Sequence, residues 1–414
     1  MESFINYQNE LVNKNKAEFS AYPSIKWLNL HQASKAQKKR DKLTEKLKEN
    51  WLFLETKPYH QQISKGCQMC GSGKWSCLFI TGKCNAGCFY CPAPQDTDSA
   101  PTSQNLHFDT PEAYAEYINY FNFKGVSFSG GEPLLFFDRT LQYLKAIRKN
   151  CPPEIYIWMY TNGILADEEK FRLLASEGLN EVRFDIGATQ FSLNKIAFAK
   201  GIIPNITIEI PAVPEEKEKL KQLLPEMIKA GVTNLNLHQL RLTKHNAPKL
   251  LKHNYTYIHA EQPVVLESEL AAFEIVNYAR DNNLKIGINY CSFFFKNRFQ
   301  KAGFRNQIAN ALADPDEIIT EKGFIREYNG SNVNYKALVI FDKETSRLNS
   351  AELPLKYKTY QFKKEMALRP ITIEGESKNE VEELLNNSTR DIPNDEILFK
   401  IWQMEYIEKG LREY

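Results

Sequence analysis

The sequence lacks any apolar run approaching the roughly 18 residues that span a bilayer, and its first residues show no charged-then-apolar signal pattern. Neither charge sign dominates, because 53 Lys and Arg residues face 51 Asp and Glu residues and leave a net charge of +2. Bulk charge therefore indicates no particular partner. Internal repeats and low-complexity linkers are also absent. A soluble cytoplasmic protein without a membrane partner is the expectation, and 414 residues suffice for two or three domains.

Cysteine is scarce and unevenly distributed. Six of the eight cysteines lie between Cys67 and Cys91, and only Cys151 and Cys291 lie elsewhere. In a reducing compartment such clustering indicates metal binding rather than disulfide bonds. Cys151 precedes two prolines and has no cysteine nearby, so we interpret it as structural.

One stretch, LFITGKCNAGCFYCPAPQ, holds three cysteines in the spacing C-x-x-x-C-x-x-C: Cys84, Cys88 and Cys91. Three thiolates on one tight loop can hold three irons of a 4Fe–4S cluster, because cysteine sulfur is the usual ligand of such clusters. The loop supplies no fourth cysteine, so one iron is left for a small molecule. A structural zinc site is the alternative, but such sites are closed and need more ligands than this loop provides.

A second pattern, VSFSGGEP, follows downstream and contains Ser129, Gly130, Gly131 and Glu132. An ordinary Gly-Gly turn would explain the glycines by themselves. Taken with the cysteine spacing, and with Tyr90 just before the last cysteine, the two patterns resemble the signature of the radical SAM superfamily.

The resemblance implies a 4Fe–4S cluster on Cys84, Cys88 and Cys91 whose open iron binds S-adenosylmethionine (SAM). The reduced cluster would cleave SAM to methionine and a 5′-deoxyadenosyl radical, which abstracts a hydrogen atom from the substrate. The protein would contribute orientation, electrostatics and exclusion of water. A low-potential electron donor is an expected partner.

SAM contacts are expected from residues of the two motifs and of later strand ends. The glycine backbones can approach the methionyl group because no side chain intervenes, and Glu132 can pair with the ammonium group. Tyr90 is expected near adenine. Asn162 and Asp185 are expected at the ribose or the methionine, with strand-end capping as the alternative, and Arg183 at the methionine carboxylate.

A second cysteine group, GCQMCGSGKWSC, precedes the loop and contains Cys67, Cys70 and Cys77. Its glycines are expected to let the backbone turn sharply around a metal. The block resembles a little-characterised group of the superfamily that is related to pyruvate formate-lyase activating enzyme and carries an extra C-x-x-C. The sequence NYCS around Cys291, followed by Lys296 and Gln300, is a further match.

The resemblance implies a second metal site, built from Cys67 and Cys70 with Cys77, Cys291 or both. An auxiliary 4Fe–4S cluster is our first choice. A zinc site with His60 as a possible ligand is the second, and unmetallated thiols are the third. Cys77 adjoins an apolar strand, where a buried free cysteine can act as a small hydrophobe.

Strands that alternate with helices predict an α/β fold, with a parallel sheet and right-handed crossovers. We expect a partial (β/α)6 radical SAM barrel at residues 63–300, a helical N-terminal extension at 1–62 and a small α+β C-terminal domain at 301–414. Core strands are predicted at 125–129, 155–160, 181–186, 206–210, 234–237 and 285–290. Helices are predicted at 111–121, 138–149, 167–176, 191–200, 215–229 and 268–282.

In such a barrel the chemistry lies at the carboxyl ends of the strands. Glu209 and His238 join the candidates on this ground. The loop from Leu240 to Gln262 holds three histidines, but their spacing fits no usual ligand motif, and we interpret them as loop surface.

The sequence predicts a radical SAM enzyme of unknown substrate, with a peptide or protein, including glycyl-radical activation, as the first class to test. RNA modification is an alternative that only the basic segment 35–48 supports. Acidic residues interleave there at helical spacing, which favours a solvated helix face and makes nucleic acid an unlikely partner. A non-enzymatic iron–sulfur carrier or zinc-stabilised binding module is the third possibility.

Overall fold

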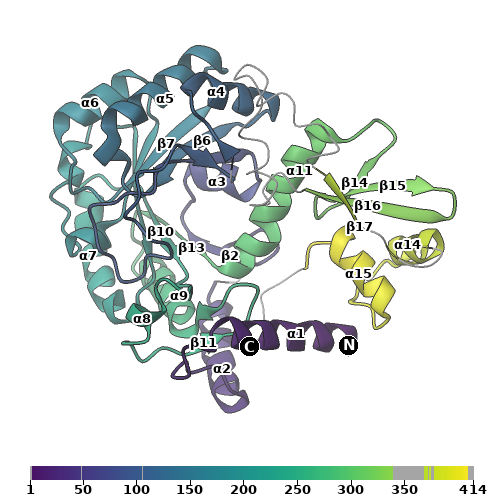
Figure 1. Cartoon of the computed structure of the whole chain (residues 1–414). Helices are drawn as coiled ribbons and strands as arrows, with labels where there is room; N and C mark the ends of the chain where they lie inside the picture. The colour runs from purple at the N-terminus through teal and green to yellow at the C-terminus, as the bar shows by residue number, and fades with distance from the viewer. Residues whose placement is uncertain are drawn as a thin grey trace.

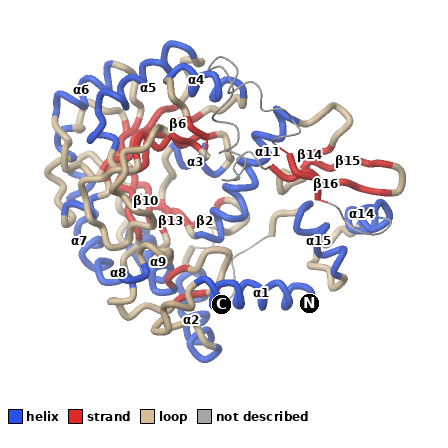
Figure 2. The backbone as a smooth tube through the Cα atoms, viewed as in Figure 1, coloured by secondary structure: helices blue, strands red, loops and turns tan. Residues whose placement is uncertain are grey.

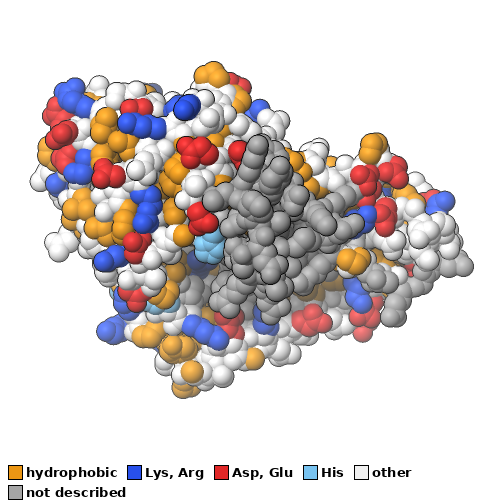
Figure 3. All heavy atoms as spheres, turned by 45° about the horizontal axis from the view of Figure 1, so that its top comes forward, with side chains coloured by type: hydrophobic (Ala, Val, Ile, Leu, Met, Phe, Trp, Pro, Cys, Tyr) orange, Lys and Arg blue, Asp and Glu red, His pale blue; other side chains and the backbone are white. Residues whose placement is uncertain are grey.

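The computed structural model describes residues 2–47, 49–104, 106–338, 368–371, 373 and 377–408. None of the helices within those residues is long and apolar enough to cross a membrane. On the face shown in Figure 3, acidic and basic side chains are interspersed over the described surface, as the near-neutral net charge predicts.

The largest element is an eleven-stranded sheet with the order β1-β2-β13-β10-β9-β8-β7-β6-β3-β4-β5. Its central strands are all parallel: β3 (Trp75–Thr81), β6 (Gly125–Gly130), β7 (Tyr156–Thr161), β8 (Glu181–Phe184), β9 (Asn205–Pro211), β10 (Asn234–His238) and β13 (Gly287–Cys291). The two edges of the sheet do not pair with each other, and the sheet curves round its inner face (Figure 2). The predicted α/β partial barrel is confirmed, with seven parallel strands where six units were expected.

Helices cover the outer face of the sheet (Figure 1). They are α4 (Pro111–Tyr120), α5 (Phe137–Asn150), α6 (Glu168–Ser176), α7 (Lys217–Lys229) and α9 (Leu266–Asp281). Thr110 caps α4 through a hydrogen bond from the Ala113 amide, and Asp167 caps α6 through the Lys170 amide. These caps lie where the sequence predicts them, so the local signals and the fold agree.

The helix predicted at 191–200 is wrong. This segment contains only the short 3-10 turn Ile196–Phe198, and Gln190 and Phe191 before it both have positive φ. Two consecutive residues in the left-handed region turn the chain and cannot start a right-handed helix.

The N-terminal residues are not only helical. After α1 (Glu2–Glu18) and α2 (Leu30–Glu45) come β1 (Trp51–Leu52) and β2 (Lys57–His60), and β2 pairs with β13 in antiparallel fashion. The short strands β4 (Thr102–Ser103) and β5 (Leu106–His107) extend the opposite edge. The segment before residue 62 therefore contributes to the main sheet, although the predicted domain boundaries themselves remain predictions.

Helix α3 (Lys65–Gly71) lies inside the curve of the sheet, enclosed by the strands (Figure 1). A Cβ atom on Gly66 would lie 2.3 Å from Arg183 Nη2, and one on Gly71 would lie 2.1 Å from the Phe53 ring. Gly66 and Gly71 thus let this helix pack closely against the barrel wall, whereas Gly73, with φ +73°, turns the chain after the helix.

The region after β13 begins with α10 (Phe293–Phe295), the π-helical turn Lys296–Gln300 and α11 (Lys301–Leu312). Phe304 and Ile308 of α11 belong to the core of the large sheet. Between β10 and α9 lie α8 (Ala247–Leu250), β11 (Tyr257–Ile258) and β12 (Val264–Val265).

A smaller antiparallel sheet follows: β14 (Ile318–Ile319), β15 (Ile325–Asn329), β16 (Asn332–Leu338) and β17 (Leu368–Ile371). Helices α14 (Ser377–Asn386) and α15 (Glu396–Glu405) accompany it, and the ring of Phe399 in α15 lies 6.0 Å from that of Tyr7 in α1, centroid to centroid. The expected C-terminal α+β arrangement is confirmed. In this region the sequence predicts strands at 323–328, 335–341 and 360–373 and helices at 379–386 and 394–411. The parts of these elements at 339–341, 360–367, 372 and 409–411 lie outside the described residues.

Candidate active site

The carboxyl ends of the parallel strands surround a cavity of about 550 Å³. Ends of parallel strands share one edge of a sheet, so motifs far apart in sequence meet there. Among the predicted site residues, the cavity is lined by Cys84, Cys88, Cys91, Tyr90, Ser129, Gly130, Gly131, Asn162, Arg183 and Asp185.

The three loop cysteines face this cavity as free thiols. Burial raises the pKa of Cys88 to about 11, and the neighbouring charges of Asp185, Cys84 and Cys91 act in the same direction. N–H donors already point at two of the sulfurs: the Gln95 Nε2 group donates to Cys91 Sγ at 2.7 Å, and Asn162 Nδ2 donates to Cys84 Sγ at 3.5 Å. A set of three sulfurs with N–H donors suits the ligands of an iron–sulfur cluster.

The loop at 240–262 packs against the cysteine loop and forms hydrogen bonds with its backbone. The side chain of Asn246 donates to Tyr90 O at 3.2 Å, and Thr243 Oγ1 donates to Pro92 O at 2.9 Å. The His253 ring stacks on Phe89 with ring centroids 4.6 Å apart. The histidine that the sequence assigns to loop surface therefore packs on the cysteine loop, a contact that no local sequence signal announces.

The glycines of the GGEP segment let two loops touch. A Cβ atom on Gly131 would lie 1.9 Å from the backbone oxygen of Lys83, and Gly130 has φ +113°. The amide of Gly131 donates to Thr81 O at 2.8 Å. These glycines thus press against the base of the cysteine loop.

Glu132 is buried below the cavity. Its carboxylate accepts hydrogen bonds from Thr161 Oγ1 at 2.8 Å, the Asn162 amide at 2.7 Å and the Leu134 amide at 2.9 Å. Burial raises its pKa, although these three bonds act in the opposite direction. In this structure Glu132 fixes the end of β7. Its predicted pairing with an ammonium group stays a prediction.

Asn162 and Asp185 stand beside the cysteine loop. Asn162 Nδ2 donates to Asn85 Oδ1 at 2.7 Å. Asp185 accepts from the Tyr90 hydroxyl at 2.9 Å and from the Gly187 amide at 3.0 Å. Burial raises the pKa of Asp185 to about 6, although hydrogen bonds from Tyr90 and the Gly187 amide oppose the shift.

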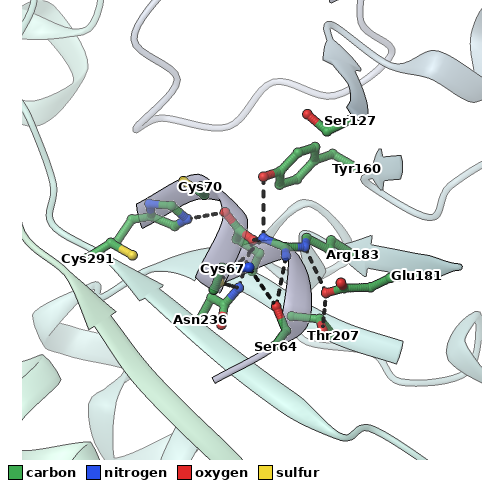
Figure 4. A network of polar contacts seen from close by, with 12 residues as sticks. Ser64, Cys67, Cys70, Ser127, Tyr160, Glu181, Arg183, Thr207, Asn236 and Cys291 are labelled. Atoms are coloured by element: carbon green, nitrogen blue, oxygen red, sulfur yellow. Dashed lines mark hydrogen bonds and ion pairs between the residues drawn. The ribbon is translucent and has the colours of Figure 1, made fainter. Parts of the chain in front are cut away.

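Arg183 lies inside the barrel beside Ser64, Cys67 and Glu181 (Figure 4). Its side chain is only 2% exposed and pairs with Glu181 at 2.8 Å and with Glu209 at 2.6 Å. A further N–H group donates to Ser64 Oγ at 2.9 Å, which ties the start of α3 to the barrel wall. All three guanidinium nitrogens thus have protein partners, so the structure gives no support to the predicted contact with a carboxylate of SAM.

A second group of thiols lies inside the barrel, where Cys67 and Cys70 project from α3 and Cys291 from the end of β13 (Figure 4). Each sulfur accepts at least one N–H hydrogen bond. Cys67 accepts from Asn236 at 3.0 Å, Cys70 from Gln300 at 2.6 Å and Cys291 from Lys57 at 2.6 Å. Burial raises the pKa of Cys70 to about 12, and the charges of Cys67 and Cys291 add to the shift.

Lys57 is the residue of this group that the sequence reasoning missed. It is buried in β2, and its ammonium group donates a hydrogen bond to the Cys291 sulfur. Burial lowers its pKa, but Cys291 and Cys67 outweigh burial and raise the value above its ordinary level.

Cys77 and His60, the other two possible ligands of the second metal site, have different surroundings from those of Cys67, Cys70 and Cys291. Burial raises the pKa of Cys77 to about 12, and the hydroxyls of Ser127 and Ser129 oppose the shift. The His60 ring bonds to Leu284 O at 2.8 Å, away from the thiols. Across the described residues, no three His, Cys, Asp or Glu side chains stand in the arrangement that holds a single metal ion.

A chain of polar groups runs along the wall of the cavity. Lys296 Nζ bonds to His238 Nδ1 at 2.8 Å, and His238 Nε2 lies 2.5 Å from Glu209 Oε1. An ammonium can only donate and a carboxylate can only accept, which makes Nε2 the protonated nitrogen of a neutral imidazole. Burial would raise the pKa of Glu209, but Arg183 and His238 lower it below its ordinary value.

Comparison with known proteins agrees with this site. Residues 78–197 match the model of the radical SAM superfamily, which confirms the resemblance carried by the cysteine loop and the GGEP segment. A 4Fe–4S cluster and SAM are the cofactors that membership implies.

A Methanocaldococcus jannaschii protein described, by inference, as a glycyl-radical enzyme activating enzyme is 29% identical over 333 residues, 76% of this chain and 84% of the relative. A GTP 3′,8-cyclase of Petrotoga mobilis is 32% identical over 108 residues, 26% of this chain and 32% of the cyclase. Streptococcus suis SuiB bound to SAM has a TM-score of 0.40 and 13% identity, over 52% of this chain and 49% of SuiB.

Proposed function

We propose that this radical SAM enzyme abstracts a hydrogen atom from a peptide or protein substrate held in the 550 Å³ cavity. The observation that carries the proposal is that this one cavity gathers the three loop cysteines and the predicted SAM residues. The description of the M. jannaschii relative as an activator of a glycyl-radical enzyme supports a polypeptide substrate.

Cys84, Cys88 and Cys91 would hold three irons of the cluster. When bound, the cluster and SAM supply a reductively generated 5′-deoxyadenosyl radical. Tyr90, Ser129, Gly130, Gly131, Asn162 and Asp185 line the adjacent wall and would bind and orient SAM. Glu132 would act as a positioning residue, because it holds the Asn162 backbone and is itself buried.

Arg183 would hold the shape of the barrel, through its pairs with Glu181 and Glu209. The cysteine loop and its supporting loop at 240–262 would limit the entry of water, which protects a radical intermediate from side reactions. A low-potential electron donor would be the partner that reduces the cluster.

A second iron–sulfur cluster would bind at Cys67, Cys70 and Cys291. The support for it is that each of the three sulfurs accepts an N–H hydrogen bond, an arrangement that tunes cluster sulfurs. Lys57 would offset the negative charge of three thiolates, because a buried cation needs an anionic partner. A zinc ion is the alternative occupant, and Cys77 would remain a free thiol.

The test is made on protein isolated without oxygen. Wild-type protein with dithionite and SAM is expected to form 5′-deoxyadenosine, and Cys88→Ala is expected to abolish it. Absence of 5′-deoxyadenosine from wild-type protein with an intact cluster would refute the proposal.

The second site is tested by metal stoichiometry. Cys70→Ala is expected to lower iron by one cluster per chain and to leave SAM cleavage partly intact. Cys151→Ala is the matched control, because its thiol is buried in the hydrophobic core and donates to the Ala115 carbonyl, and it is expected to keep all iron. Unchanged iron in Cys70→Ala would show that the second cluster is not there, and stoichiometric zinc would identify the alternative.

A further inference from the structure

The cavity has two chemically different walls. The predicted SAM residues come from the ends of β6, β7 and β8, whereas β10, β13 and the turns after them supply the opposite wall. That opposite wall carries three cations: Arg241, Lys296 and Lys301.

Arg241, like Lys296 and Lys301, forms no ion pair with a carboxylate among the described residues. Its guanidinium lies over the Phe293 ring, 5.6 Å from the centroid, and Lys296 Nζ lies over the same ring at 4.9 Å. The Arg241 carbonyl accepts from Asn246 at 3.0 Å, so its backbone is fixed. Burial lowers the pKa of Arg241, as expected for a cation whose charge is not neutralised, although Cys91 opposes the shift.

The other charges near the cavity have partners. Glu209 is held by Arg183 and His238, and through His238 it also offsets Lys296. Asp185 lies on the SAM wall and accepts from Tyr90. Glu261 pairs with Arg298, although its charge also reaches Lys301. An excess of positive charge therefore remains on the substrate side of the cavity.

The same wall also offers an acceptor. Asn297 is 7% exposed and lines the cavity, and its Oδ1 has no hydrogen-bond partner among the described residues. A planar guanidinium suits a bidentate oxyanion, and an amide oxygen suits an N–H group beside it. A carboxylate next to a backbone amide, as at an acidic residue or the C-terminus of a peptide, presents both groups.

We propose that Arg241, with Lys296 and Lys301 beside it, forms an oxyanion-binding site that holds a carboxylate or phosphate group of the substrate across the Phe293 ring. This inference deepens the proposed function and rests on it, because it names the group by which the substrate is held. The competing explanation is that Arg241 only offsets the charge of the thiolates at Cys91.

The test measures binding of small probes to full-length, anaerobically reconstituted protein with SAM present, by isothermal titration calorimetry. The probes are N-acetylglycine, its uncharged amide and inorganic phosphate. Wild-type protein is expected to bind N-acetylglycine or phosphate and not the amide, and the preferred anion distinguishes a carboxylate substrate from a phosphorylated one. Failure to bind either anion would overturn the proposal.

Variants locate the site. Arg241→Gln is expected to weaken binding of the anion at least tenfold, and Lys301→Gln, at the exposed rim, about threefold. Arg172→Gln removes the same charge from a side chain that is 66% exposed on α6, and it is expected to change nothing. Unchanged anion binding in both cavity variants, or loss of iron from Arg241→Gln with anion binding intact, would overturn the proposal.

The two proposals fail separately. Wild-type protein that forms 5′-deoxyadenosine but binds neither anion refutes the oxyanion site alone. Protein that binds N-acetylglycine but never cleaves SAM refutes the proposed function.

Discussion

Replacing Arg183 by methionine tests whether this residue serves the barrel or the cofactor. The change removes a guanidinium that is 2% exposed, pairs with two buried carboxylates and lies 5.0 Å from the centroid of Trp158. Glu181 and Glu209 would then keep their charges without their cation. Removing one partner of a buried ion pair costs about 3–5 kcal/mol, which is a large fraction of the roughly 5–15 kcal/mol that stabilises a typical protein.

The assay is equilibrium unfolding in urea, followed by tryptophan fluorescence under anaerobic conditions, with the slope determined for each variant. Arg172→Met is the matched control, since its ion pair with Glu168 is exposed on α6 and should contribute under about 0.5 kcal/mol. Adding Glu181→Gln to Arg183→Met should recover about 1–3 kcal/mol, because it removes one stranded charge.

SAM binding separates the two roles. Arg183→Lys should bind SAM within about twofold of wild-type protein, because all three guanidinium nitrogens face protein groups. Two results together would refute this reasoning: a decrease of under 1 kcal/mol in the free energy of unfolding of Arg183→Met, and a more than tenfold loss of SAM affinity in Arg183→Lys. They would support the contact with SAM that the sequence predicts.

Two further predictions concern the cysteine loop. Gly131→Ala should displace the loop and lower bound iron by more than half, because the new Cβ would lie 1.9 Å from Lys83 O. Gly87→Ala is the control and should retain iron, because its new Cβ would have nothing within 4 Å. Equal iron contents in the two variants would contradict this prediction. Asn246→Ala should speed the loss of iron to a chelator at least threefold, because it removes hydrogen bonds to Tyr90 O and Arg241 O, each contributing about 1 kcal/mol. Asn194, exposed on another loop, provides the control, and equal rates would exclude the supporting role of Asn246.

Local signals in the sequence predict most of the barrel. Thr110 with Pro111, Asp167 and the glycine after α6 mark helix ends by chemistry that acts within a few residues. The helix predicted at 191–200 failed because the positive φ values before it follow from packing and leave no signature in composition.

The part of the site that depends only on the order of the strands could be predicted from the sequence. The ends of parallel strands must meet, so the cysteine loop, GGEP, Asn162 and Asp185 could be assigned to one cavity. Contacts across the barrel could not be assigned. Arg183 meets Ser64 and Lys57 meets Cys291 only because α3 and β2 enter from outside the repeating units, and their partners lie 119 and 234 residues away in sequence.

The position of α3 and β2 in the barrel has a consequence for the order in which the chain folds. The residues that surround Cys67 and Cys70 come from almost the whole described length of the barrel, so α3 can be enclosed only after β13 has been synthesised and added to the sheet. Contacts of such sequence separation form late in folding. If the proposed second cluster binds these thiols, we expect it to be inserted before β2 and β13 close the sheet around α3.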